Sequence, residues 1–543
     1  MAKHFLFSLF FLLFTTACLA HHSELDRFNQ CQLDSINALE PDHRVESEAG
    51  LTETWNPNHP ELQCAGVTLI RRTIDPNGLH LPSYSPSPQL IFIIQGKGVL
   101  GLAVPGCPET YEEPRSQSRQ KQQQRDSHQK IRRFSKGDVI AIPPGIPYWT
   151  YNHGDEPLVA ISLLDTSNTL NQLDSTPRVF YLGGNPEAEF PETQEQEQPR
   201  RVVPFGRRGG QNQKQEESEE QNEGNSVLSG FGAEFLAQSL NTNEHTAKRL
   251  RSPQDKRGQI VKVEDGLDII SPELQEEEQQ QQSQSQREEE EEEEREQRYR
   301  KHSEKEEEDE DEPRSHETRR KWKKHTEEKK RESHGQGKEK EQVEEEEKEE
   351  EEEVHREHSK GSKNGLEETI CTTKIHENIA RPSRADLYNP RAGRISTVNS
   401  LTLPILRNLR LSAEYVLLYR NGIYAPHWNI NANSLLYVIR GQGRVKIVNS
   451  QGNPVFDDKV RKGQLVVVPQ NFVVAEQAGN EEAFEYVVFK TNDRAAVSHV
   501  KQVFRATPAE VLVNAFGLRK SEVAQIKYNG NRGSLVQPQS QSQ

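Results

Sequence analysis

Methionine and closely spaced cysteines are nearly absent from this sequence. The only methionine is Met1, and the five cysteines form no Cys-x-x-Cys pair. The spacing argues against a zinc ribbon and against a thioredoxin-type redox site. Gly-x-Ser-x-Gly, P-loop and His-Glu-x-x-His motifs are also missing. No nucleophile, phosphate-binding loop or zinc-protease pair is therefore indicated.

Long hydrophobic runs are missing everywhere except at the N-terminus. Residues 5–14 form an apolar stretch, and small residues follow it up to Ala20. The stretch is too short to cross a bilayer. It predicts a secretory signal peptide over residues 1–20, with cleavage after Ala20. We therefore expect a mature protein of the secretory pathway that contains no membrane segment.

Four cysteines remain after removal of this signal peptide: Cys31, Cys64, Cys107 and Cys371. An even number in an oxidising compartment predicts two disulfides. The sequence by itself allows three pairings of four cysteines.

Negative charge is concentrated in one segment. Residues 273–363 contain 36 Asp and Glu against 21 Lys and Arg, a net charge of −15 out of −16 for the whole chain. Its hydrophobic side chains are too few to bury the apolar surface that would offset backbone entropy. We predict a disordered acidic linker. The basic run at residues 319–324 is attributed to charge pairing inside this linker, and no nucleic-acid binding is expected.

The chain contains an internal repeat. The sequence LIFIIQGKG at residues 90–98 matches LLYVIRGQG at residues 435–443, and each is an apolar strand pattern ending in a glycine turn. Downstream, residues 136–152 match residues 462–478 and share a Gly-x5-Pro spacing. The first copy is longer because it contains the polar low-complexity residues 112–130.

Each copy reads as many short strands followed by a helical pattern. In the second copy, Thr507 to Glu510 predicts a capping box with proline at the first helical position; Ser229 and Glu234 give a weaker version in the first copy. Two jelly-roll β-barrels, each with a small helical extension, fit this order, because closed sheets leave few exposed edges. The expected fold class is mainly β, with long disordered acidic and Gln-rich loops.

The predicted domain organisation follows from these composition changes. We expect a signal peptide, an acidic-chain domain with two flexible loops, the acidic linker, a basic-chain domain and a Gln/Ser tail. In that order the residues are 1–20, 21–272 with loops at 112–130 and 185–224, 273–363, 365–536 and 537–543.

Three further stretches give the repeat a family resemblance. Residues 29–50, residues 386–400 and residues 424–443 resemble legumin-type 11S seed globulins, which are two-cupin proteins. The stretch Asn364-Gly365-Leu366-Glu367-Glu368-Thr369-Ile370-Cys371 looks like the processing site of that family. The likeness extends over residues 28–530.

The resemblance implies a processing and assembly scheme. A vacuolar Asn-specific protease would cut between Asn364 and Gly365 to give an acidic and a basic chain. Cys107 and Cys371 would join these chains, and Cys31 and Cys64 would pair within the acidic chain. Trimers of legumin-type subunits would form first and hexamers after the cut, in the protein storage vacuoles (protein bodies) of seeds. The charge agrees, since residues 365–543 have a net charge of +8.

Enzymes of the cupin superfamily, as the resemblance implies, hold a metal with two histidines, a glutamate and a further histidine. Spacing from Gly96 places the equivalent positions at Ser83, Ser85 and Gln89 in the first copy, and spacing from Gly137 places the last at Tyr148. In the second copy, the same count gives Trp428, Ile430, Ser434 and Val474. These are poor metal ligands, and the nearby His80 and His427 are interpreted as structural residues. No catalytic, cofactor-binding or metal-binding residue is predicted.

Storage is the favoured function. The chain has 43 glutamines, concentrated in the low-complexity loops, and amide-rich loops suit a nitrogen reserve that is later degraded. The alternatives are a metal-dependent cupin oxidoreductase or isomerase and a sugar- or peptide-binding cupin module. We expect a nutrient reservoir and no enzyme.

Overall fold

The computed structural model describes residues 31, 33–109, 111–112, 127–191, 225–251, 254–267, 371–528 and 533–537. Within these residues, one compact unit contains two β-barrels with their helices. A second unit contains the strands β7 (Tyr111–Glu112) and β8 (Ser127–His128) and the Cys107–Cys371 disulfide. The signal peptide, the acidic linker and the Asn364–Gly365 bond lie outside the described residues.

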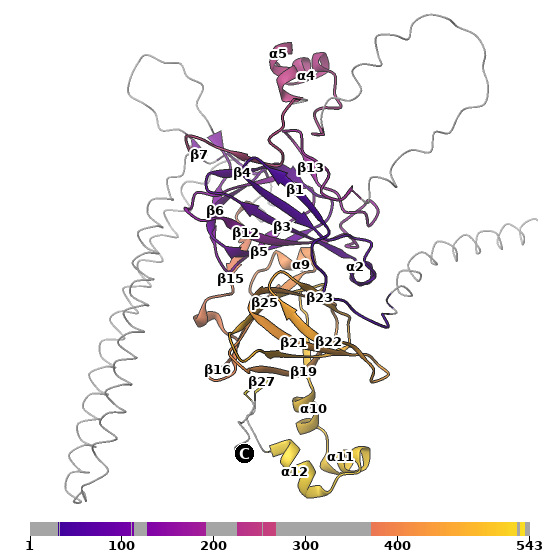
Figure 1. Ribbon diagram of the computed structural model, residues 1–543. Coiled ribbons are helices and arrows are strands. Elements are labelled where there is room, and N and C mark those ends of the chain that lie inside the picture. Colours follow the sequence, from indigo (N-terminus) through magenta and orange to yellow (C-terminus); the bar gives the residue numbers. More distant parts are fainter. Residues whose placement is uncertain are drawn as a thin grey trace, which may run out of the picture. The chain divides into compact units, whose positions relative to one another are not determined.

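The N-terminal barrel is built from two antiparallel sheets (Figure 1). The first sheet has the order β1 (His43–Ser47), β2 (Gly50–Thr54), β3 (Val67–Ile74), β12 (Leu158–Asp165), β5 (Gln89–Gln95), β10 (Asp138–Ile142) and β15 (His376–Asn378). The second has the order β13 (Phe180–Tyr181), β4 (Gly78–Tyr84), β11 (Tyr148–Tyr151), β6 (Lys97–Leu102) and β9 (Ile131–Ser135), with β14 (Ile260–Lys262) also paired to β4.

The C-terminal barrel repeats this topology. Its first sheet has the order β16 (Leu387–Asn389), β17 (Gly393–Val398), β18 (Ser412–Leu418), β25 (Phe484–Lys490), β20 (Ser434–Arg440) and β23 (Leu465–Val468). Its second has the order β22 (Pro454–Arg461), β21 (Gln442–Val448), β24 (Val473–Ala478), β19 (Ile423–Asn429) and β26 (Val497–His499), with β27 (Leu535–Val536) paired to β19. The shared strand order confirms the duplication that the sequence repeat predicts.

The two barrels pack against each other through their first sheets. Strand β5 is apolar from residue 90 to residue 94 because it is buried on both faces. Ile91 and Ile93 face the barrel interior, whereas Leu90 and Phe92 belong to the core between the barrels. A strand that is buried on both faces has a continuous apolar sequence and does not alternate between apolar and polar residues. The ring of Phe92 stacks on that of Tyr415 from the C-terminal barrel, with centroids 6.1 Å apart.

Each barrel also holds a segment from the other half of the chain. Strand β15 adds to the edge strand β10 of the N-terminal barrel, with Ile140 opposite His376. In return, the N-terminal stretch before β1 lies on the C-terminal barrel, where Leu39 and Leu465 exchange backbone hydrogen bonds of 2.8 and 2.9 Å. Ile36 is buried in the same barrel's core.

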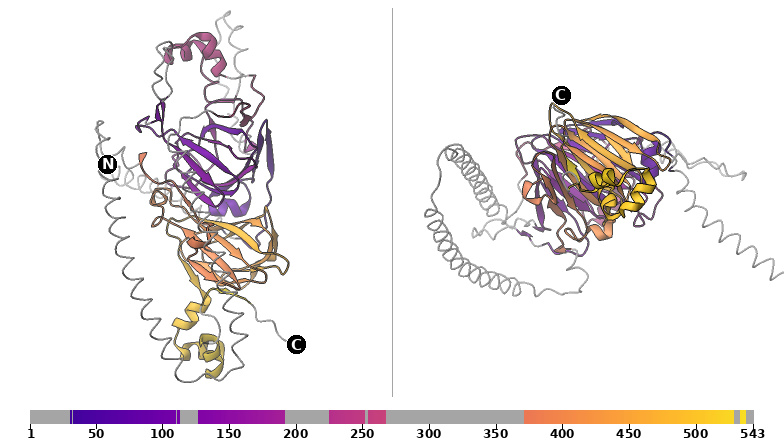
Figure 2. Two further views of the ribbon diagram at one scale, coloured as in Figure 1. Left: turned by 90° about the vertical axis from the view of Figure 1, so that its left-hand side faces the viewer. Right: turned by 90° about the horizontal axis from the view of Figure 1, so that it is seen from below.

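A helical extension follows each barrel, as the sequence predicts. Helices α4 (Ala233–Ser239) and α5 (Glu244–Leu250) follow the first, and α10 (Val500–Ala506), α11 (Ala509–Phe516) and α12 (Lys520–Tyr528) follow the second (Figure 2). Short helices also lie at α2 (Pro60–Ala65), η1 (Pro382–Arg384) and α9 (Leu406–Leu409). Of the helices in the described residues, none is both long and apolar enough to span a bilayer.

Two local predictions were wrong. The expected capping box at Thr507 does not form, because the Thr507 hydroxyl donates to the Val503 carbonyl of the preceding helix and no side chain caps α11. The expected flexible loop at residues 185–224 begins too early, since Glu189 and Phe190 are buried in the N-terminal barrel. Glu189 lies in a polar stretch, and nothing in the neighbouring sequence indicates that its side chain is buried.

Candidate functional site

Three of the four ligand positions predicted in the N-terminal barrel, Ser83, Gln89 and Tyr148, come together as neutral side chains. Ser83, Ser85, Gln89 and Tyr148 are all buried. Ser83 lies opposite Tyr148 in the pairing of β4 with β11. The Tyr148 hydroxyl donates to the Gln89 side-chain oxygen at 3.1 Å. The Ser85 hydroxyl accepts from the Ser87 backbone amide at 3.2 Å. These hydroxyl and amide groups supply neither imidazole nor carboxylate for a metal.

In the C-terminal barrel, two of the predicted positions were wrong by one residue. His427 and Asn429 are the buried residues on β19, whereas Ile430 is 48% exposed and Trp428 is partly exposed. His427 pairs with Val474 as Ser83 pairs with Tyr148. The stretch from His427 to the start of β20 is one residue longer than the stretch from Ser83 to the start of β5. Since side chains alternate along a strand, a shift of one residue turned the predicted pair to the wrong face.

A buried ion pair lies inside the N-terminal barrel. Arg72 on β3 binds Glu189 at 2.8 Å, and their side chains are 7% and 3% exposed. The Tyr181 hydroxyl donates to the same Glu189 oxygen at 2.6 Å and lies 3.4 Å from His80 Nε2. Burial, together with the Arg72 charge, lowers the pKa of His80 well below its usual value. His80 is therefore a neutral structural imidazole beside a fixed cation.

A second ion pair lies inside the C-terminal barrel. Lys490 on β25 donates to Glu414 on β18 at 2.7 Å, and the side chains are 4% and 6% exposed. Removing two charges from water is costly, and a close, hydrogen-bonded contact offsets that cost. The pair lines an internal cavity of about 10 Å³, together with His427, Glu476 and Tyr486.

His427 and Glu476 approach within 3.9 Å in this cavity but do not form an ion pair. Burial, then the nearby Glu414, raises the pKa of Glu476 well above its usual range, which favours the protonated carboxyl. Burial also lowers the pKa of His427 to about 3. His427 Nδ1 lies 3.1 Å from the Ala425 carbonyl, which fits a neutral ring that donates there. Burial therefore favours the uncharged form of both groups.

Each barrel interior thus contains a cation that belongs to the protein, Arg72 in one and Lys490 in the other. A metal ion placed beside either would meet like charge in a medium of low dielectric constant, which is unfavourable. No group of three or more His, Cys, Asp or Glu residues suited to a metal occurs in the part of the chain that the structure describes. The cavity at Lys490 has room for about one water molecule and none for a substrate.

The structure forms two disulfides. Cys31 pairs with Cys64, with Cα atoms 4.7 Å apart, and Cys107 pairs with Cys371, with Cα atoms 5.4 Å apart. This is the pairing that the family resemblance implies. The second disulfide joins residues on opposite sides of the Asn364–Gly365 bond.

The sequence reasoning missed both buried ion pairs. A signal was present for one of them, because Glu414 and Lys490 are charged residues within strongly apolar strand sequences. A charge in such a strand is seldom buried without a partner. For the other pair no comparable signal exists, since Glu189 lies in a polar stretch far from Arg72 in sequence.

Two barrels of one topology, joined in a single chain, define a two-cupin protein. The sequence model described as Cupin matches residues 36–188 and 377–524. Legumin J of Pisum sativum is 71% identical over the full length of both chains. Glycinin G4 of Glycine max is 60% identical, covering 98% of this chain and 97% of the other. The crystal structure of procruciferin, an 11S globulin of Brassica napus, covers 94% of this chain and 99% of that chain at 32% identity, with a TM-score of 0.68.

The chain belongs to the legumin-type 11S globulins. Proteins of this family are seed storage proteins, and the chain is accordingly a nutrient reservoir and not an enzyme. The interiors of its barrels agree with that role, because their buried charges are paired within the protein.

Proposed function

We propose that the chain is a storage precursor that is cut once, after Asn364, by an Asn-specific vacuolar protease. The signal peptide at residues 1–20 directs it to the secretory pathway, and it accumulates in the protein storage vacuoles of seeds. The cut separates an acidic chain from a basic chain. The observation that carries this proposal is the Cys107–Cys371 disulfide, which keeps the two products joined.

Two features favour a cut at this bond. The acidic segment before it is rich in charge and poor in apolar residues, and such sequence offers a protease extended, accessible backbone. The cut also divides the charge, since residues 365–543 carry +8 and the remainder −24. The Asn364→Gln variant tests the site directly. Incubation with an Asn-specific protease should leave this variant whole and divide the unaltered precursor into two chains.

We further propose that subunits assemble head to tail into trimers, and that trimers stack into hexamers after the cut. Each helical extension carries a patch of exposed apolar side chains, and the two patches differ in composition. The first patch, on α4 and the residues that flank it, consists of Phe231, Phe235 and Leu240. The second, on α11 and α12, consists of Val511, Phe516, Ile526 and Tyr528. Two unlike patches that bind each other give a heterologous contact, which closes into a ring when the rotation permits.

Sizing of the precursor before and after cleavage tests the assembly order. We expect a trimer that becomes a hexamer on cleavage, and an Asn364→Gln precursor that stays a trimer. The Phe516→Ser variant should weaken the trimer, whereas Leu401→Ser, at a position 69% exposed outside the helical extensions, should not. An unchanged mass on cleavage would contradict the order, and equal behaviour of the two variants would contradict the contact.

A further inference from the structure

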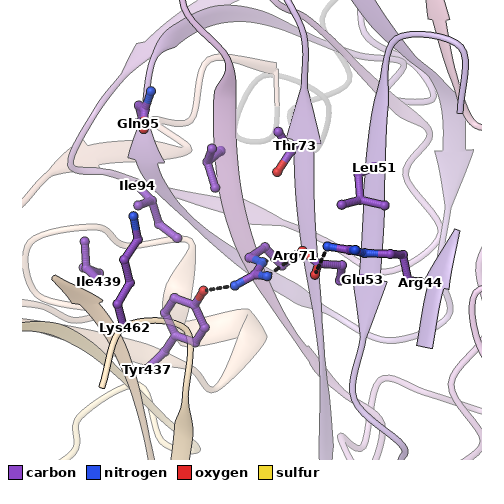
Figure 3. A pocket seen from close by; sticks show the side chains of 11 residues that line it. Arg44, Leu51, Glu53, Arg71, Thr73, Ile94, Gln95, Tyr437, Ile439 and Lys462 are labelled. Carbon is purple, nitrogen blue, oxygen red and sulfur yellow. Dashed lines mark hydrogen bonds and ion pairs between the residues drawn. The ribbon is translucent and has the colours of Figure 1, made fainter. Parts of the chain in front are cut away.

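A pocket of about 310 Å³ opens at the seam between the two barrels, outside both barrel interiors (Figure 3). Strands β1, β2, β3, β5 and β12 of the N-terminal barrel contribute to it. The C-terminal barrel contributes Tyr437, Ile439 and Lys462. Its size lies at the lower end of the range that small organic ligands occupy. The storage role explains no part of this pocket.

The polar side of the pocket carries excess positive charge. Arg44, Arg71 and Lys462 line it, and Glu53 is the only acidic residue among the lining residues. Glu53 is fully engaged. One of its oxygens accepts from Arg44 at 3.2 Å, and the other binds Arg71 at 2.7 and 2.6 Å. A single carboxylate thus serves two guanidinium groups.

Arg71 is held in place from both barrels. Its guanidinium donates to the Tyr437 hydroxyl at 2.9 Å while it binds Glu53. Figure 3 shows the Arg71 side chain between these two partners, with Lys462 on the Tyr437 side of the pocket. Burial raises the pKa of Tyr437, so the phenol stays neutral and does not offset the charge. Gln95 donates to Glu156, which places one further carboxylate beside the pocket, outside its lining.

The other side of the pocket is apolar and partly exposed. Leu51, Ile94 and Val159 are only partly buried, and Ile439 lies beneath them at 7% exposure. Aliphatic surface beside an excess of two positive charges matches a molecule with one anionic end and one apolar end. An inorganic anion would leave the aliphatic wall exposed to water, and a neutral lipid would leave the charge unmatched.

We propose that this seam pocket binds a small organic monocarboxylate with an aliphatic body. The carboxylate lies between Lys462 and Arg71, and the hydrocarbon part covers Ile94, Val159 and Ile439. Binding there would bridge the two barrels, because Lys462 and Ile439 come from one and the remaining contacts from the other. The storage globulin would then carry a small acid as cargo, independently of its processing.

Octanoate is the probe, and its binding to the purified full chain is measured by titration calorimetry at low salt. We expect octanoate to bind and octanamide, the neutral analogue, to bind much more weakly. Lys462→Gln should weaken octanoate binding by about two- to fivefold, the range for one solvent-exposed ion pair. The matched control is Lys459→Gln, which removes an exposed lysine outside the pocket and should leave the affinity unchanged.

A second variant tests the apolar wall without disturbing the fold. Val159→Thr keeps a β-branched side chain at a half-buried strand position, where threonine is well accepted, so the unfolding temperature should change little. The added hydroxyl makes the wall less apolar and should weaken octanoate binding. A crystal structure with octanoate should place the carboxylate within hydrogen-bond distance of Lys462. The proposal is overturned if octanoate does not bind, if octanamide binds equally well, if Lys462→Gln behaves like Lys459→Gln, or if the density lies elsewhere.

Discussion

At the scale of single residues, the barrel interiors differ from metal sites in the sign of the charge that they already contain. Arg72 and Lys490 are buried cations, each with a carboxylate partner, in barrels whose ligand positions hold serine, glutamine, tyrosine, asparagine and valine. The one histidine at a ligand position, His427, stays neutral because burial lowers its pKa to about 3. The buried charges of each interior are therefore balanced within the protein. Changes to these titratable groups should change the free energy of unfolding.

Lys490→Met is expected to destabilise the protein by about 3–5 kcal/mol, because it leaves Glu414 buried without its partner. The double variant Glu414→Gln/Lys490→Met should recover much of that loss. Urea unfolding at neutral pH measures both. Lys446→Met removes an exposed member of a surface ion pair and serves as the control, with little expected effect. A double variant no more stable than Lys490→Met would contradict the pairing.

Glu476→Gln is expected to stabilise the protein at neutral pH. Burial and Glu414 raise the pKa of Glu476, while Lys490 opposes the shift. Above the usual pKa of 4.5 the unfolded chain loses this proton but the folded chain keeps it, so wild-type stability falls as pH rises. The gain should grow by at most about 1.4 kcal/mol per pH unit above that value and vanish below it.

The same unfolding experiment, repeated across the pH range, measures this gain. The facing groups His427, Tyr424 and Tyr486 are unchanged in the variant, so the difference reports Glu476. Exposed Glu481→Gln is the matched control. A variant that is less stable than the wild type at neutral pH would show that Glu476 is ionised in the folded protein.

At the scale of strands and turns, the repeat in the sequence was sufficient to predict two barrels. Gly96 and Gly441, which end the matching strands β5 and β20, have φ angles of +82° and +74°. Such angles favour glycine, and for this reason the glycine turns were reliable markers of the repeat. The loop before each strand was not reliable, since one added residue moved the inward positions to His427 and Asn429.

Other elements could not be predicted because their partners are distant in sequence. Strand β15 pairs with β10 more than two hundred residues away, and Glu189 binds Arg72 across the barrel. Neither contact can be predicted from the residues that neighbour these positions in the sequence. The capping box at Thr507 failed for a related reason, since the hydroxyl had a carbonyl available in the helix before it.

Gly441→Ala tests the turn at the end of β20. A Cβ atom at this position would lie 2.1 Å from the Ala483 carbonyl oxygen, in addition to the strain of a positive φ. Gly452 has a φ of +79° but open space around it, so Gly452→Ala carries the strain alone. We expect Gly452→Ala to cost about 1–2 kcal/mol and Gly441→Ala clearly more, measured by urea unfolding. Equal losses would contradict the close approach.

At the scale of the whole molecule, the two halves of the chain complete each other. Residues 33–39 add to the C-terminal barrel, and β15 adds to the N-terminal barrel. The sheets of the two barrels also share a core that contains Trp55, Phe92 and Tyr415. After a cut at Asn364, these contacts would join the acidic and basic chains independently of the disulfide.

Reduction of the cut protein under native conditions is therefore expected to leave the two chains associated. Native size-exclusion chromatography after reduction of Cys107–Cys371 should give an unchanged elution volume, and the chains should separate only when a denaturant is added. The uncut Asn364→Gln protein, treated in the same way, controls for effects of reduction on the fold. Separation of the chains by reduction alone would show that the disulfide, and not the exchanged segments, joins them.

The intact mass of the protein purified from the seed, measured with and without reductant, reports both the cut after Asn364 and the disulfide that joins the two chains. We expect one species without reductant and two after reduction, with the masses of residues 21–364 and 365–543. A single chain after reduction, or a chain boundary at another residue, would contradict a storage precursor that is cut once at Asn364 and held together by Cys107–Cys371.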